Sequence, residues 1–396
     1  MRSVDEHRRV VAGLITAREP VTVPVAEALG LVLAEDVVAP LSLPGFDNSA
    51  MDGYAVVGDD IAAATDDTPV RMPVTEDIPA GRTDIPTLTA GTAHRIMTGA
   101  PLPSGATAVV PVESTDGAID TVTIRASVRP GQHVRRAGED VTAGSTVLRA
   151  GQVVTPAALG LAAALGLSEL TVVPRQRVLV MSTGTELVAP GTPLQPGQIY
   201  ESNAVMLAAA VREAGGDVVA SPMTGDDVEV FRETLAGHTG DADLVVTTGG
   251  VSAGAYEVVK DALTGAVEFV KVAMQPGMPQ GAGTLEDGTP IITLPGNPVS
   301  ALVSFEVFIR PALRAAMGLP DPERPRRTAA LTEDLTSPRG KRQFRRGVLD
   351  GDTVTSYGPP ASHHLRWLAS ANCLLELDED TVEAAAGERV QVWDLR

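Results

Sequence analysis

The chain has 396 residues, a length that favours several domains over a single core. Hydrophobic residues make up 44% of it and charged residues 20%, which is typical of a folded protein and excludes a disordered one. The formal net charge of -19 opposes general binding to nucleic acid or to an anionic membrane surface, so we expect neither partner.

The order of residues also bears on location. No run of about 18 consecutive apolar residues occurs, so we expect no membrane span. The first fifteen residues mix acids and bases before a short apolar stretch, which indicates an amphipathic helix rather than a signal peptide. Cys373 is the only cysteine, so an intramolecular disulfide cannot form. These features predict a cytoplasmic protein.

The first half of the chain contains two kinds of sequence pattern, one helical and one β-rich. Residues 1–45 carry an apolar stripe at positions 10, 11, 14 and 15, and a second helix is predicted over 24–31. Residues 46–145 alternate short β-rich runs with Gly, Pro, Asp and Thr turns. Thr155-Pro156 then supplies an N-cap and a first-turn proline for another helix. We therefore predict a helical linker domain, residues 1–45 and 146–174, split by a β-rich insert over 46–145.

Apolar runs and helical segments alternate over residues 175–318, where Ser202 is the predicted cap of a helix over 204–214. The apolar runs are Val178–Met181, Val218–Ala220, Leu244–Thr247, Phe269–Met274 and Ile291–Leu294. Strands alternating with helices predict a doubly wound, parallel α/β sheet. Residues 319–396 return to short strands and turns, which predicts a separate small β domain.

The loops after these strands are the expected ligand site, because open α/β sheets bind ligands outside the carboxyl ends of their strands. Five such loops contain glycine, namely Ser182–Glu186, Thr224–Asp227, Thr247–Ser252, Gln275–Gly277 and Pro295–Ser300. Glycine lets backbone N–H groups approach an anion, and Ser300 lies where a helix starts and N–H groups are free. The loops therefore predict a crevice that accepts phosphate.

Acidic side chains lie on the same rim, namely Glu186, Asp226, Asp227 and Glu257. They would repel a bare phosphate, but a divalent cation among them would bridge to phosphate oxygens. Asp226 and Asp227 have a second interpretation as caps of the next helix. The sequence contains no zinc-ligand spacing and no Walker motif. The residues alone thus indicate a nucleotide- or phosphoester-binding α/β enzyme that uses a divalent ion.

Basic residues cluster twice, as Arg135-Arg136 and as the group Lys341, Arg342, Arg345 and Arg346. In so acidic a chain, an anionic ligand would need such a cluster. The alternative is an ordinary solvated face.

Motifs along nearly the whole chain resemble one family. Pro44–Ala55, which reads PGFDNSAMDGYA, resembles the signature of the molybdopterin molybdenumtransferases, the MoeA family and the E domain of gephyrin. Further motifs follow in the family's order at Ile96–Pro101, Arg135–Asp140, Ser182–Leu187, Gly249–Gly254, Leu294–Ala301, Phe344–Gly347 and Ala361–His363. The resemblance implies a multidomain α/β plus β protein: the split helical domain, the insert, an adenylyltransferase-like α/β domain over 175–318 and a C-terminal β barrel over 319–396.

The resemblance also implies an activity, in which molybdenum from molybdate is inserted into adenylylated molybdopterin with release of AMP. The family uses a divalent cation, usually Mg²⁺, and this step belongs to molybdenum cofactor biosynthesis. A homodimer is implied, in which the insert of one subunit completes the site of the other. A transient contact with the molybdopterin adenylyltransferase is compatible with this role.

Carried over by position, the resemblance assigns Asp52, Thr98 and Asp140 to the site from the insert. From the α/β domain it assigns Glu186, Asp226, Glu257 and Lys271 to catalysis, with Asp226 and Glu257 as metal ligands. Further substrate contacts are implied for Gly249, Gly250, Ser252, Gln275, Pro276, Ser300, Arg346 and Ser362. Arg346 and Ser362 would hold molybdate, since a guanidinium offers a fixed charged fork to oxyanion oxygens.

The chain departs from the family at a few positions. Gln275 and Met278 stand where many members have lysine, Ala255 stands at an often acidic position, and Glu257 replaces an aspartate. A specialised paralogue that loads a different metal or pterin nucleotide is therefore one alternative. A molybdopterin adenylyltransferase is another, although Thr247–Ser252 lacks the Thr-Gly-Gly-Thr-Gly loop expected there. A non-catalytic scaffold is the third, and the retained acids argue against it.

Overall fold

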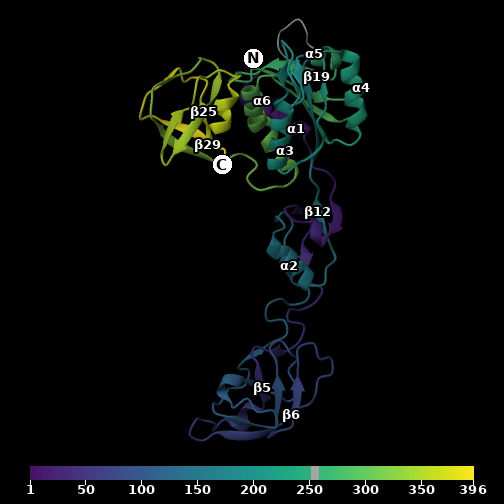
Figure 1. The fold of residues 1–396 in the computed structure, drawn as a ribbon, viewed down its shortest axis with the longest axis vertical. Coiled ribbons are helices and arrows are strands. Elements are labelled where there is room, and N and C mark those ends of the chain that lie inside the picture. Colours follow the sequence, from purple (N-terminus) through teal and green to yellow (C-terminus); the bar gives the residue numbers. More distant parts are fainter. Residues whose placement is uncertain (251–257) are drawn as a thin grey trace. The chain divides into compact units, whose positions relative to one another are not determined.

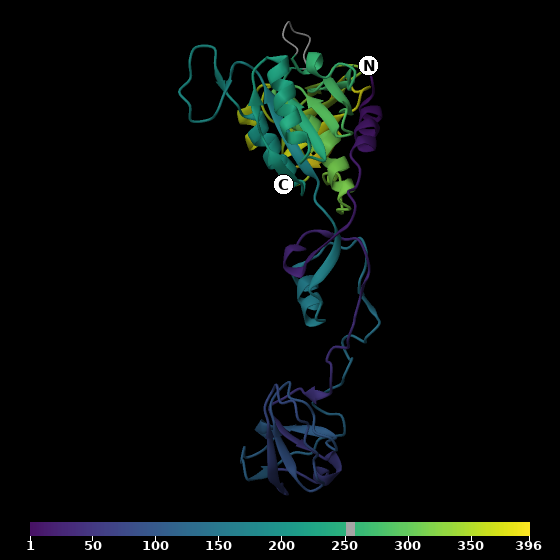
Figure 2. The same ribbon diagram turned by 90° about the vertical axis from the view of Figure 1, so that its right-hand side faces the viewer.

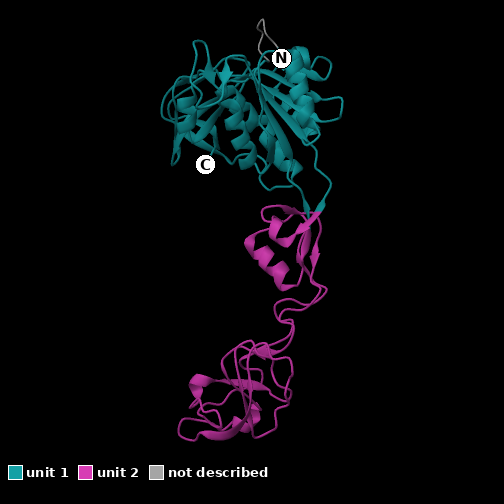
Figure 3. Cartoon of the chain, turned by 45° about the vertical axis from the view of Figure 1, so that its right-hand side comes forward, with its two compact units in different colours: residues 1–21, 171–396 teal, residues 22–170 magenta. Residues whose placement is uncertain are grey.

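The computed structural model describes residues 1–250 and 258–396. The chain forms two compact units, residues 1–21 with 171–396 and residues 22–170 (Figure 3). In the described ranges, no helix combines the length and the apolar character needed to cross a membrane.

Unit 1 (residues 1–21 and 171–396) contains a seven-stranded sheet. Its strands are β13 (Arg177–Thr183), β16 (Asp217–Ala220), β17 (Met223–Thr224), β18 (Leu244–Thr248), β19 (Val267–Lys271), β21 (Pro279–Thr284) and β22 (Pro290–Leu294). β16, β13, β18 and β22 pair in parallel in that order, whereas β21 runs antiparallel to both β22 and β19. Four of the five predicted apolar runs are confirmed as strands of this sheet, whereas Phe269–Met274 covers the end of β19 and Met274 of a separate strand that pairs outside the sheet. β21 is an addition to the prediction.

Helices cover both faces of this sheet (Figures 1 and 2). They are α1 (Val4–Leu14), α3 (Asn203–Glu213), α4 (Val228–Thr239), α5 (Val258–Ala262), α6 (Pro298–Ser304), the π-helical turn η4 (Phe305–Ile309) and α7 (Arg310–Ala316). In β13, Val178 and Val180 join the core under α1, α3 and α6, while Leu179 and Met181 join the core under α4 and α5. Adjacent residues thus alternate between two cores, which confirms the doubly wound arrangement.

Helix α1 packs in unit 1, which differs from its expected place in the linker domain. It begins with a capping box between Ser3 and Glu6, and its buried face contacts η4 and α7. Val4 and Val11 of that face are fully buried. The apolar stripe correctly predicts a helix with one buried face, but helical periodicity does not identify the surface that covers this face.

His7 of α1 links stability to pH. Its ring is 0% exposed and lies edge-on to Phe308 at 4.7 Å between ring centroids. Burial, together with Arg2, lowers the pKa of His7 to about 4. The unfolded chain, with an imidazole pKa of about 6.5, therefore binds the proton more readily than the folded chain between these two values. Folding stability should fall as pH drops through this window and be unaffected by His7 above it.

Between pH 7 and pH 4.5, the unfolding free energy of the wild type should fall by roughly 1–3 kcal/mol more than that of a His7→Phe variant. Urea denaturation at a series of pH values measures this difference. A His238→Gln variant, which changes a half-buried histidine near the end of α4, serves as the control. Parallel pH profiles of the wild type and His7→Phe would contradict the assignment.

The C-terminal part of unit 1 is a closed barrel, as predicted. Its strands are β23 (Arg326–Leu331), β25 (Arg342–Asp350), β26 (Thr353–Ser356), β27 (Cys373–Leu377) and β29 (Arg389–Asp394). They pair in the order β25-β26-β23-β29-β27, and pairing of β25 with β27 closes the ring. The short pair β24 (Leu335–Thr336) and β28 (Glu383–Ala384) and the helix α8 (Leu365–Ser370) accompany it. β20 (Met274–Gln275), from the chain before β21, pairs with β25 and so joins the barrel to the α/β part.

The linker region of unit 2 (residues 22–170) contains less helix than predicted. Helix α2 (Pro156–Ala164) is present, and the Thr155 hydroxyl accepts from Ala158 N at 3.2 Å as its cap. The helix predicted over 24–31 is wrong, because the chain there forms β1 (Val21–Pro24) and a single 3-10 turn, η1 (Val25–Glu27). β1 and β2 (Val32–Leu33) flank β12 (Glu169–Val173). The β-branched residues before Pro24 favour strand pairing over a helix this short.

The insert in unit 2 is β-rich, as predicted. Five strands pair in the order β8-β5-β7-β6-β9, namely β8 (Ala108–Pro111), β5 (Gly53–Val56), β7 (Ala93–Ile96), β6 (Val70–Ile78) and β9 (Thr121–Ile124). Two short antiparallel ribbons pair the segments at which the chain enters and leaves the insert. They are β4 (Asn48–Ser49) with β10 (Val134–Arg135) and β3 (Val37–Val38) with β11 (Thr146–Leu148). The β4–β10 ribbon joins the motif Pro44–Ala55 to the motif Arg135–Asp140.

Candidate functional site

The strand-end loops of unit 1 meet at one cavity of about 1050 Å³. The carboxyl ends of β13, β18 and β22 line it together with residues of β20 and of the 360–365 segment. Eight predicted site residues lie in its lining: Glu186, Asp226, Gly249, Gly250, Gln275, Pro276, Ser300 and Ser362. All of these except Ser362 belong to the loops at which the rule for α/β sheets predicts ligand binding.

The strand ends in the cavity lining meet closely at glycine residues. Gly249 follows β18 with a φ of +96°, and a Cβ atom there would lie 2.4 Å from the Thr183 carbonyl oxygen. A Cβ on Gly296 would lie 3.3 Å from the Gly249 Cα. Glycine at these positions lets three strand ends approach closely in the cavity lining.

The two adjacent acids of the Thr224–Asp227 loop have different roles. Asp226 Oδ2 accepts hydrogen bonds from Thr185 N at 3.1 Å and from Thr185 Oγ1 at 2.9 Å, which fixes its carboxylate in the cavity lining. Asp227 Oδ1 accepts from Val230 N at 2.9 Å and caps α4. The two interpretations of this pair thus divide between its members: Asp226 remains available to a ligand and Asp227 is a helix cap.

Sequence reasoning missed several polar residues of the lining, among them Glu201 and Asn203. Ser202 is the N-cap residue of α3, as predicted, but its side chain makes no cap hydrogen bond; Glu201, which is 7% exposed, accepts from Ala204 N at 2.6 Å instead. Asn203 Nδ2 donates to the Gly296 carbonyl at 2.6 Å and to Thr248 Oγ1 at 3.2 Å. The signal was present in the sequence, since both residues open a helix beside the crevice.

Arg346 lies next to the cavity and holds one of its loops. It is 4% exposed, and its Nη1 donates to the carbonyls of Ala361 at 3.0 Å and His364 at 3.2 Å, while Nη2 donates to that of Pro359. The loop is also held by Val299 N, which donates to the Ser362 carbonyl at 3.0 Å. These bonds differ from the predicted oxyanion fork, because the guanidinium binds carbonyl groups and thereby positions Ser362.

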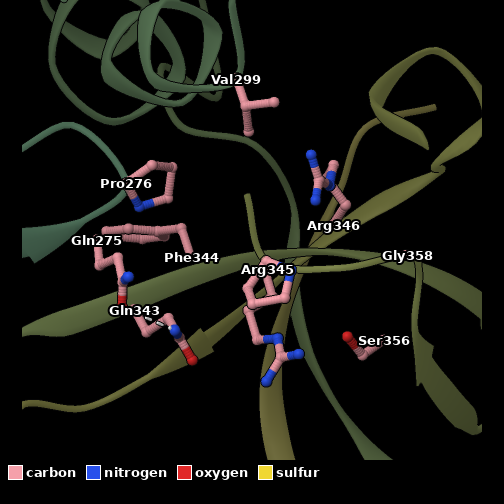
Figure 4. Close-up of a pocket in the computed structure, with 10 residues that line it drawn as sticks. Gln275, Pro276, Val299, Gln343, Phe344, Arg345, Arg346, Ser356 and Gly358 are labelled. Atoms are coloured by element: carbon pink, nitrogen blue, oxygen red, sulfur yellow. Dashed lines mark hydrogen bonds between the residues drawn. The ribbon is translucent and has the colours of Figure 1, made fainter. Parts of the chain in front are cut away.

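Neighbouring residues of β25 face opposite ways (Figure 4). Arg346 points toward Val299, whereas Arg345 points away and donates to the Thr336 carbonyl at 3.4 Å. On the Arg345 side, Gln343 Nε2 donates to Gln275 Oε1 at 3.1 Å across the β20–β25 pair. The alternation is that of a strand, and it divides the basic cluster between two surfaces.

Three predicted residues of the α/β domain are not placed in the cavity. Lys271, at the end of β19, is exposed and is absent from the lining. Ser252 and Glu257 lie outside the described residues. In the described ranges, no group of three or more His, Cys, Asp or Glu side chains has a metal-binding arrangement.

The predicted residues of the insert lie in unit 2, where two of them form a pair. Thr98 donates to Asp52 Oδ1 from its N at 2.6 Å and its Oγ1 at 2.8 Å, which lowers the pKa of Asp52. Asp140 is exposed, and its N donates to the Leu43 carbonyl at 3.0 Å. Arg136 Nη1 donates to Asp47 Oδ2 at 2.6 Å, which holds the two family motifs together.

Comparison with known proteins extends over nearly the whole chain. The MoeA N-terminal region (domain I and II) matches residues 2–166, a probable molybdopterin binding domain matches 179–315, and the MoeA C-terminal region (domain IV) matches 328–395. Molybdopterin molybdenumtransferase 2 of Mycobacterium tuberculosis is 69% identical over 405 residues, with 100% of each chain covered. Molybdopterin molybdenumtransferase 1 of that organism is 39% identical, covering 99% and 98%.

A solved structure agrees in fold. The molybdopterin biosynthesis MoeA protein of Pyrococcus horikoshii superposes with a TM-score of 0.83 and 29% identity, covering 100% of this chain and 99% of that one. Since the relatives match this chain along its full length and all three family regions occur in order, the chain belongs to the molybdopterin molybdenumtransferase (MoeA) family.

Proposed function

We propose that this protein inserts molybdenum from molybdate into adenylylated molybdopterin and releases AMP, as a cytoplasmic step of molybdenum cofactor biosynthesis. The observation that carries the proposal is the unit 1 cavity, whose lining combines glycine-containing strand ends, the fixed carboxylate of Asp226 and the 360–365 loop with Ser362. The full-length similarity to molybdopterin molybdenumtransferases supports it.

Different groups of the lining bind the two anions, the phosphate of the nucleotide and molybdate. The backbone around Gly249 and Gly296 binds phosphate, since residues without a Cβ let the anion approach the main chain closely. Ser300, near the start of α6 and 4% exposed, adds a hydroxyl to the cavity lining. Ser362 presents a neutral donor to the second anion, molybdate, on the loop that Arg346 holds.

The carboxylates fit a Mg²⁺ ion that binds together with the substrate. Asp226 and Glu186 offer two hard oxygen side chains in the lining, and Mg²⁺ is commonly held by one or two carboxylates plus phosphate and water. Glu257 is the third proposed donor on sequence grounds. The ion would neutralise pyrophosphate charge as AMP departs.

An Asp226→Asn variant tests the cation site. Its side-chain oxygen can still accept from Thr185, so the loop is kept while the charge is lost. We expect AMP release to fall by roughly 10–100-fold and half-maximal activity to require more Mg²⁺. Asp227→Asn is the matched control, because that residue caps α4 and should leave the Mg²⁺ response unchanged. A wild-type Mg²⁺ response from Asp226→Asn would refute this assignment.

We propose further that Asp52 and Thr98 act in a homodimer on the cavity of the second copy. Asp52→Asn and Asp226→Asn are each expected to keep at most about a tenth of the wild-type activity alone. If equal amounts are unfolded together and refolded, half of the dimers are mixed and each mixed dimer has one intact site. Activity should return to about a quarter of the wild-type value. No recovery, with mixed dimers verified by mass, would count against shared sites.

The adenylyltransferase alternative makes a different prediction. That enzyme would consume ATP and release pyrophosphate, whereas the proposed reaction releases AMP from adenylylated molybdopterin and requires molybdate. Chromatography of the nucleotides with each substrate pair separates the two. A scaffold would yield neither product.

A further inference from the structure

We propose that Lys341 is the cationic side chain that binds a tetrahedral oxyanion in the unit 1 cavity. This inference rests on the proposed function for the identity of the anion but on the geometry of the cavity for the residue. Among the described lining residues, Lys341 is the only lysine or arginine. The lining also contains three carboxylates, Glu186, Glu201 and Asp226.

The other members of the basic cluster are already engaged. Arg342 contacts Asp5 at 3.0 Å and Glu379 at 3.0 Å, so its charge is compensated. Arg345 faces the Thr336 carbonyl, and Arg346 donates to three carbonyls of the 359–364 loop. Over the described part of the chain, Lys341 has no carboxylate partner within ion-pair distance. It is therefore the one charge of the cluster that remains available to a ligand.

The strand pairing places Lys341 at the edge of the β20–β25 pair, in the same cavity lining as Ser300 and Ser362. β20 and β25 are parallel, with Met274 opposite Arg342 and Gln275 opposite Gln343, so Lys341 directly precedes this pairing at the cavity edge. Gln275 and Met278, which line the cavity on the β20 side, are both uncharged. A positive charge at this rim therefore has to come from the barrel segment, and Lys341 supplies it.

Electrostatics gives the lysine a large expected effect. The chain carries a net charge of -19, and three carboxylates line the same cavity, so an entering dianion is repelled unless a cation compensates. The half-buried ammonium is screened by salt less than a fully exposed one. Arg346 is then a positioning residue that holds Ser362 next to the site of the anion.

Binding of sodium molybdate and, separately, of AMP to the purified full-length protein tests this without turnover. Isothermal titration calorimetry should show molybdate affinity at least about 10-fold weaker in Lys341→Ala, with Lys341→Arg closer to wild type. A loss confined to AMP would assign the same contact to the phosphate instead, and the two titrations distinguish these sources of the oxyanion.

Arg339→Ala is the matched control, since it removes one positive charge from the same segment at an exposed position outside the lining. It should bind both anions as the wild type does. The inference is overturned if Lys341→Ala binds molybdate and AMP with wild-type affinity, or if Arg339→Ala weakens binding as much as Lys341→Ala. Absence of molybdenum insertion by the wild type, with Lys341-dependent anion binding intact, would reject the proposed function alone.

Discussion

An Arg346→Ala variant is expected to lose about 100-fold in kcat/KM for molybdate, equivalent to roughly 2.7 kcal/mol of transition-state stabilisation. The guanidinium is 4% exposed and donates to the carbonyls of Pro359, Ala361 and His364. Removing it leaves these carbonyls without their charged donor and frees the loop that carries Ser362. Steady-state turnover at varied molybdate concentration measures the loss.

Two companion variants separate positioning from charge. Arg346→Lys keeps the positive charge, but its single ammonium nitrogen cannot reproduce the guanidinium's bonds to three carbonyls. We therefore expect it to be nearly as impaired as Arg346→Ala. Arg345→Ala removes a charge from the adjacent, opposite-facing position and should change kcat/KM by less than about 3-fold. Full activity in Arg346→Lys would mean that the residue acts through its charge on the anion and not through the loop.

A Gly249→Ala variant is expected to be both unstable and inactive. The new Cβ would lie 2.4 Å from the Thr183 carbonyl oxygen and 2.8 Å from Thr183 Oγ1, at a backbone φ of +96°. The strand ends cannot move apart without displacing residues of the cavity lining. We expect a loss of roughly 2–4 kcal/mol in unfolding free energy and about 100-fold in activity. Urea denaturation and the AMP-release assay measure the two effects.

Gly265→Ala isolates the contribution of backbone conformation. Gly265 has a similar φ of +88°, but a Cβ there would meet nothing within 4 Å. We expect it to lose only about 1 kcal/mol and to keep its activity. Equal losses in the two variants would show that the left-handed backbone conformation alone, and not the close approach at Thr183, explains the glycine.

Patterns local in sequence predicted most of the fold. The apolar runs that became β13, β18 and β22 are buried on both faces, and such strands read as continuous hydrophobic segments. β21 had no such signal, because Gly281 and Gly283 interrupt it. The structure shows why glycine is required: a Cβ would lie 2.2 Å from Thr293 Oγ1 at Gly281 and 2.0 Å from the Ala266 carbonyl oxygen at Gly283. Close contact with neighbouring strands thus requires glycine in β21, and the glycines remove the apolar run by which the other strands were predicted.

Roles within the site were harder to predict than its location. The sequence shows four basic residues near position 341, but their partners come from distant parts of the chain. Arg342 meets Asp5 across 337 residues of sequence, and this contact removes it from the candidates. Arg346 meets carbonyls, which no side-chain pattern reveals. Composition and topology therefore locate a site, whereas the assignment of charges within it requires the tertiary contacts.

The most direct test of the proposed function is the molybdenum content of the pterin product. Purified protein would be incubated with adenylylated molybdopterin, Mg²⁺ and micromolar molybdate, and the released pterin would be separated and analysed for molybdenum and AMP. We predict that molybdenum and AMP appear in equal amounts and that omission of Mg²⁺ or molybdate suppresses both. Release of AMP without molybdenum in the pterin, or no release at all from the folded protein, would contradict the proposal.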